Sequence, residues 1–111
     1  MIMANQPPDM EDIVKMYRGL AILQTLHREV SQSSNEEVMR AWLDELKMGG
    51  TREQIRMELE RLASLGLIQT ELRGHKGNTM VFWLREAGLD YLESRSAIEG
   101  LPKIGPDTSI F

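Results

Sequence analysis

A change in apolar spacing at Gly66 constrains the fold of this chain more than any other sequence feature. Before Gly66, residues 52–65 carry apolar side chains at the period of an amphipathic helix. After it the period becomes two, and residues 67–73 and 79–84 each divide into two alternating sets, as strands do. These runs flank the sequence GHKGN, whose glycines and asparagine tolerate positive φ. The chain is therefore predicted to contain a helix followed by an antiparallel hairpin.

Signals at both ends indicate a second helix, over residues 35–48. Ser34 with Glu37 has the spacing of a capping box at its start. Gly49 and Gly50 suit a left-handed C-cap at its end. Its apolar face is expected to comprise Val38, Met39, Trp42, Leu43 and Leu46.

The helix over residues 52–65 also begins with a capping box, formed by Thr51 and Gln54. Its buried positions are expected to be Ile55, Leu59 and Leu62. A final helix is predicted over 86–96, after the hairpin.

The first helix, predicted over 10–30 with Asp9 as N-cap, carries apolar residues on two sides. One stripe comprises Ile22, Leu23, Leu26 and Val30, and the other comprises Ile13, Tyr17 and Leu20. A glycine in mid-helix costs about 1 kcal/mol relative to alanine, so Gly19 indicates a close backbone approach. The second stripe is expected to contact either the C-terminal helix or a second subunit, and a homodimer is predicted.

The resulting order is helix, helix, tight turn, helix, hairpin, helix. It predicts an α+β fold that is mainly α, with a three-helix core, a two-stranded hairpin and a C-terminal helix. Residues 1–8 are expected to form a disordered N-terminal lead, 9–96 the domain, and 97–111 an extended C-terminal tail.

The composition is that of an ordinary globular protein. The chain has 111 residues, of which 41% are hydrophobic and 27% charged, and its formal net charge is −4. It contains no cysteine, no apolar run long enough to span a membrane and no signal-peptide pattern near Met1. A cytoplasmic protein without membrane contact is expected.

The sequence lacks the patterns that usually carry catalysis. His27 and His75 lie on separate elements, and no nucleotide-binding or hydrolase motif is present. The pair Glu36 and Glu37 is interpreted as acidic residues at a helix N-terminus. No enzyme activity, catalytic residue, metal site or cofactor is predicted.

Several motifs resemble winged helix-turn-helix DNA-binding domains over residues 18–95. TREQIRMELERLASLGLI is similar to the third, recognition helix and its exit into the wing. FWLREAGLDYL resembles the close of the wing, although Arg85 replaces the usual threonine and puts the cap of the next helix in question. With YRGLAILQTL and IEGLPKIGP, the likeness is greatest to small winged-helix proteins of Mu-like phages and prophages, which implies a transcriptional regulator that binds double-stranded DNA.

The resemblance implies that the third helix enters the major groove and that the wing contacts the DNA backbone. Residues 51–85 hold six Lys and Arg against four Asp and Glu, so positive charge is concentrated there. Candidate DNA-binding residues are Thr51, Arg52, Arg56 and Met57 on the helix and Arg73, His75, Lys76 and Asn78 on the hairpin.

Two other interpretations remain open. Arg56 could pair with Glu53 or Glu60, and Arg61 with Glu58, to stabilise their own helix. The domain could also be a protein-interaction adaptor that does not bind DNA. Its candidate partner surface comprises Val81 and Trp83 on the hairpin, together with Ile13, Tyr17 and Leu20.

Overall fold

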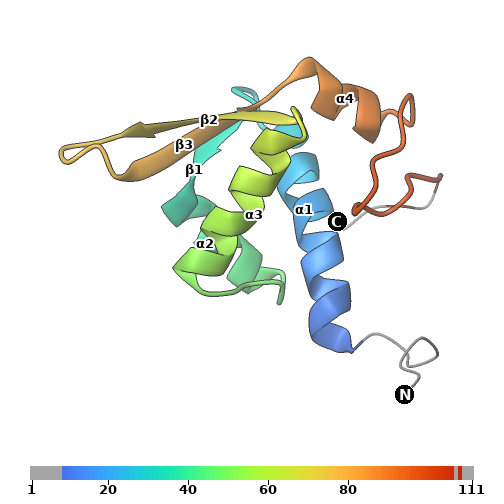
Figure 1. Cartoon of the computed structure of the whole chain (residues 1–111), viewed down its shortest axis with the longest axis horizontal. Coiled ribbons are helices and arrows are strands. Elements are labelled where there is room, and N and C mark those ends of the chain that lie inside the picture. The colour runs from blue at the N-terminus through green and yellow to red at the C-terminus, as the bar shows by residue number, and fades with distance from the viewer. Residues whose placement is uncertain (1–8, 107, 109–111) are drawn as a thin grey trace.

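We describe residues 9–106 and 108 of the protein from a computed structural model (Figure 1). These residues form a small α+β domain with four helices and three strands. The helices are α1 (Met10–Arg28), α2 (Glu36–Glu45), α3 (Arg52–Ser64) and α4 (Glu86–Leu92). The strands are β1 (Ser33–Asn35), β2 (Ile68–Arg73) and β3 (Thr79–Leu84). The predicted lead over 1–8, and residues 107 and 109–111 of the predicted tail, lie outside the described residues.

The three strands form one antiparallel sheet in the order β1-β3-β2. The predicted hairpin is confirmed: β2 and β3 pair from Ile68 opposite Leu84 to Arg73 opposite Thr79. Strand β1 was not predicted, because three residues of the polar sequence SQSSN are too few to show a period of two. It adds a third strand to the hairpin by pairing Ser33 with Trp83 and Asn35 with Val81.

The core lies where α1, α2 and α3 meet one face of the sheet. Its members include Leu23 from α1, Leu43 from α2 and Leu59 from α3, each fully buried, together with Phe82 from β3. Leu20 is also 0% exposed. Leu20 was therefore wrongly assigned to the partner surface: it lies on the inward side of α1 and packs in the chain's own core.

The helix caps agree with the sequence at two positions and differ at a third. Oδ1 of Asp9 accepts a hydrogen bond from the Asp12 amide at 2.9 Å, and the Thr51 capping box is present. The predicted Ser34 cap is wrong. Asn35 caps α2 instead, because its Oδ1 accepts from the Val38 amide at 2.9 Å.

The end of α2 also differs from the prediction. Lys47, with φ of 61°, adopts the left-handed conformation that was assigned to Gly49 and Gly50. The two glycines are required for space instead, because a Cβ at Gly49 would collide with the side chain of Asp44, and one at Gly50 would lie 2.7 Å from Oε1 of Gln54.

Like α2, helices α1 and α4 are shorter than predicted, and some apolar positions face solvent. Helix α1 ends at Arg28, which leaves Val30 outside the helix and fully exposed. Helix α4 ends at Leu92, two residues before Ser94 takes a left-handed φ of 64°. On α2, Val38 and Trp42 are exposed rather than buried, whereas Met39 and Leu43 are buried and Leu46 is partly buried.

The close approach predicted at Gly19 is confirmed. A Cβ there would lie 2.6 Å from Glu58 Oε2 on α3 and 2.8 Å from Cδ2 of Leu101 in the C-terminal segment. Leu101 is buried, so this segment packs against α1 and α3. None of the helices in the described part of the chain combines the length and apolar character that a membrane crossing requires.

Candidate nucleic-acid interface

The candidate surface combines the N-terminal half of α3 with the loop of the β2–β3 hairpin. The hairpin extends beyond the helices in Figure 1, on the same side as α2 and the start of α3. Nη2 of Arg56 donates to the backbone oxygen of Asn78 at 2.8 Å, so the helix and the end of the hairpin loop are in contact. Thr51, the N-cap of α3, and Met57 on α3 are exposed, as is every residue from Arg73 at the end of β2 to Asn78.

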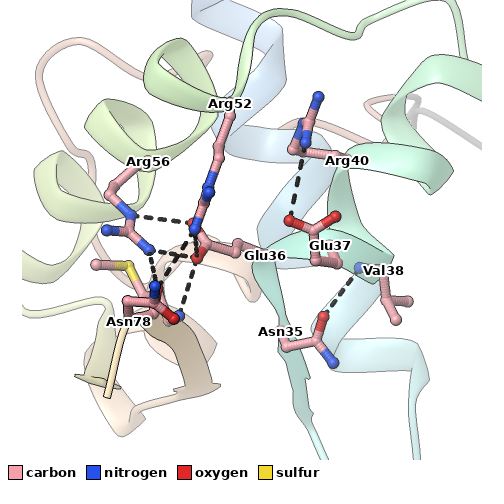
Figure 2. Close-up of polar contacts among 9 residues, drawn as sticks. Asn35, Glu36, Glu37, Val38, Arg40, Arg52, Arg56 and Asn78 are labelled. Carbon is pink, nitrogen blue, oxygen red and sulfur yellow. Dashed lines mark hydrogen bonds and ion pairs between the residues drawn. The ribbon is translucent and has the colours of Figure 1, made fainter. Parts of the chain in front are cut away.

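A buried carboxylate organises the junction between these elements (Figure 2). Glu36 is the first residue of α2, and its side chain is 1% exposed. Its Oε2 accepts from Nε of Arg56 at 3.0 Å, and its Oε1 accepts from Nη2 of the same arginine. The Met80 amide and Nη2 of Arg52 also donate to Oε1, at 3.0 and 3.3 Å.

We call Glu36, Arg52, Arg56 and the backbone of Asn78 and Met80 the Glu36 cluster. It ties α2, α3 and β3 together at one point, and Figure 2 shows both arginines pointing toward the carboxylate. The arginines lie four residues apart and so share one side of α3, next to the face that buries Ile55 and Leu59. The cluster therefore holds the first half of α3 against the end of the hairpin loop.

The electrostatics of the cluster keep both partners ionised. Burial favours the neutral form of Glu36, but hydrogen bonds from Arg56 and the Met80 amide, the charge of Arg56 and the hydrogen bond from Arg52 outweigh it. Together they hold the pKa of Glu36 below its ordinary value of 4.5. The hydrogen bond to Glu36 raises the pKa of Arg56, so this pair stays charged at neutral pH. Two arginines and one carboxylate leave the cluster with a surplus positive charge.

Arg56, a candidate DNA-binding residue, turns toward Glu36 and Asn78 instead of outward into solvent. Its hydrogen-bonded partner is Glu36, twenty residues away, rather than Glu53 or Glu60. Because its guanidinium is engaged inside the protein and its side chain is only 28% exposed, the geometry argues against a direct base contact. Arg61 does form the predicted pair with Glu58, at 2.6 Å.

The hairpin loop carries a more open group of basic residues. His75, Lys76 and Asn78 are exposed at its tip. Arg73 is also exposed but pairs with Glu71, whose Oε1 lies 3.0 Å from its Nε. A hydrogen bond and the charge of Arg73 lower the pKa of Glu71, and this pair offsets part of the positive charge of the loop.

The candidate partner residues fall into two groups. Val81 and Trp83 are half-buried beside β1, where they line a shallow hollow with Arg73. Ile13 and Tyr17 remain 43% and 37% exposed on the first turns of α1. The α1 residues are thus more accessible than the hairpin residues.

The sequence analysis missed the role of Glu36, although a signal was present. Glu36 lies three residues before Met39 and seven before Leu43, so it shares the buried face of α2, whereas Glu37 does not. A carboxylate in phase with core residues is rarely buried unless it is paired. The helical position of Glu36 could therefore have identified it, and not Glu37, as the buried and paired glutamate.

No group of three or more histidine, cysteine, aspartate or glutamate residues in the described part of the chain is placed to hold a metal ion. Comparisons with protein-family models, with curated proteins and with solved structures find no match for this chain.

Proposed function

We propose that the protein is a winged-helix protein that binds double-stranded DNA, with α3 in the major groove and the β2–β3 hairpin as a wing on the DNA backbone. The observation that carries the proposal is the contact between the start of α3 and Asn78 of the hairpin. This contact brings Arg52 and Arg56 of α3 beside the hairpin that carries Arg73 and Lys76, so four cations of an acidic chain lie on one side of the molecule. The order of helices and strands is consistent with a winged helix and supports the proposal.

The resemblance of the sequence motifs to winged-helix proteins of Mu-like phages and prophages extends the proposal. We propose that the protein is a phage or prophage transcription regulator and acts in the cytoplasm. This extension rests on that resemblance alone.

The number of free cations favours weak binding by a single copy. Glu36 and Glu71 each offset an arginine of the surface, which leaves Arg52 and Lys76 as its least neutralised cations. Affinity for duplex DNA comes largely from neutralising phosphates, so few contacts per copy mean a modest affinity and a shallow salt dependence. A homodimer would double the number of contacts and read two half-sites.

Fluorescence anisotropy with a random-sequence duplex tests DNA binding directly. Binding should weaken between about 50 and about 200 mM salt. Lys76→Ala should weaken binding to all sequences evenly and lower the salt slope by about one. Lys103→Ala, which removes an exposed lysine from the C-terminal segment, is the matched control and should leave the slope unchanged. The absence of binding at the lower salt concentration would contradict the proposal.

The exposed apolar residues of α1 favour a second function, that of a protein-interaction adaptor. Met10, Ile13 and Tyr17 are spaced by three and four residues and are all exposed, as on a helix face that meets another protein. A second copy would give a homodimer, for which light scattering should report about twice 12.7 kDa. If DNA does not bind, substitution of Ile13 or Trp83 by alanine should instead break a partner complex.

A further inference from the structure

The two arginines of the Glu36 cluster are held with different strength. Arg56 donates from Nε and Nη2 to the two oxygens of Glu36, and from Nη2 to the Asn78 oxygen at 2.8 Å. Arg52 reaches Glu36 and Asn78 from one nitrogen, at 3.3 and 3.4 Å. These distances lie at the long end for N–H···O hydrogen bonds. The Arg52 side chain is also 51% exposed, compared with 28% for Arg56.

One carboxylate cannot neutralise both cations. Both oxygens of Glu36 are already taken by Arg56, and the Met80 amide shares Oε1. A bidentate arginine–carboxylate pair is stronger than a single contact from one nitrogen. Arg52 is therefore the surplus cation, and it lies where α3 meets the hairpin.

We propose that Arg52 leaves Glu36 to bind a backbone phosphate of duplex DNA, whereas Arg56 stays on Glu36 as a positioning residue that holds the hairpin against α3. This inference rests on the proposed DNA-binding function. It assigns phosphate binding to one arginine and positioning to the other, although the sequence gives no reason to distinguish them. Glu36 then has two effects. It orders the surface through Arg56, and it competes with the phosphate for Arg52.

The competition predicts that removing the charge of Glu36 strengthens binding through Arg52. In anisotropy titrations with a random duplex, Glu36→Gln should raise the affinity at a given salt concentration but leave the salt slope nearly unchanged, because Arg52 contacts one phosphate in both proteins. Arg52→Ala should make the slope shallower by about 0.9. The double variant should match Arg52→Ala, because the residue that gains from the loss of Glu36 is absent.

Two control variants separate this effect from a change in net charge. Glu37→Gln removes the neighbouring carboxylate, which is 63% exposed and 3.8 Å from Arg40. It should raise the affinity by much less than Glu36→Gln does, and by the same factor with or without Arg52. Arg95→Ala removes an exposed, paired arginine beyond α4 and should leave the slope unchanged.

Each outcome decides a specific point. If the wild-type protein does not bind, the proposed function and this inference both fail. If it binds and Arg52→Ala leaves the slope unchanged, only the inference fails, and this arm does not depend on the folding of any Glu36 variant. If the gain from Glu36→Gln persists in the double variant, the released cation is Arg56, and the assignment of roles is overturned.

Discussion

Two arginines of helix α3, Arg56 and Arg61, each have a glutamate three residues earlier in the sequence. In the structure they pair with glutamates in different ways. Near the end of α3, Arg61 pairs with Glu58, three residues earlier on the same helix. In its first half, Arg56 pairs with Glu36, which belongs to another helix and is almost fully buried. The first pair lies within one helix, and Arg61 also donates to the Gly100 oxygen at 3.5 Å. The second pair joins α2 and α3 to the hairpin.

The comparison shows that charge spacing along one helix identifies local pairs only. Arg56 has Glu53 three residues earlier, the same spacing that correctly predicts the Arg61 pair, and Glu60 four residues later. Glu36 displaces them because its carboxylate is buried and needs a partner, whereas exposed carboxylates are solvated by water. A buried charge therefore determines the partner more strongly than proximity along the helix.

The largest expected effect is on stability, when the buried pair is broken. Arg56→Ala leaves the Glu36 carboxylate buried without its main partner and should lower the free energy of unfolding by about 3 kcal/mol. Arg61→Ala should cost about 1 kcal/mol, because a pair within one helix contributes little and some packing is lost with it. Urea unfolding followed by circular dichroism measures both values.

A matched variant tests whether the cost of Arg56→Ala arises from the stranded charge. Adding Glu36→Gln to Arg56→Ala should recover part of the lost stability, since a neutral amide is less costly to bury than a carboxylate. Equal losses for Arg56→Ala and Arg61→Ala would remove the distinction between the two pairs.

An intermediate effect is expected in the pH dependence of stability. The pKa of Glu36 lies below 4.5 in the folded protein, so its ionised form stabilises the fold above the ordinary glutamate pKa. That contribution is lost as the pH falls through the folded pKa, because the unfolded chain then binds the proton more readily. The difference in Tm between the wild type and Glu36→Gln should therefore be largest near neutral pH and shrink in acid. Glu37→Gln is the control for loss of a carboxylate at the start of α2. If its difference in Tm from the wild type shrank equally in acid, the pH dependence could not be assigned to Glu36.

Most of the fold could be predicted from the sequence, and the failures have physical causes. The period change at Gly66 and the Thr51 capping box are local signals, and they located α3 and the hairpin correctly. Strand β1 was missed because it exists only through pairing with β3. The surface position of Val38 and the inward turn of Arg56 depend likewise on neighbours that are distant in the sequence.

The candidate site was predicted less completely than the fold. Its location on α3 and the hairpin followed from charge and order, but the division of roles within it did not. Arg52 and Arg56 are identical residues on one helix face, and only the position of a third side chain distinguishes them.

The smallest expected effect is the change in stability caused by Arg52→Ala. Arg52 contacts the same carboxylate as Arg56, so the two variants compare a loosely held and a tightly held arginine on one partner. Arg52 makes two long hydrogen bonds from a half-exposed side chain, and Glu36 keeps Arg56 and the Met80 amide as partners when it is removed. Exposed ion pairs contribute little, so the free energy of unfolding should change by less than about 0.5 kcal/mol. Arg95→Ala, measured in the same way by urea unfolding, shows how much the free energy of unfolding changes when an exposed arginine is removed. A loss approaching that of Arg56→Ala would mean that both cations hold the junction together, in which case Arg52 would not be free to leave it.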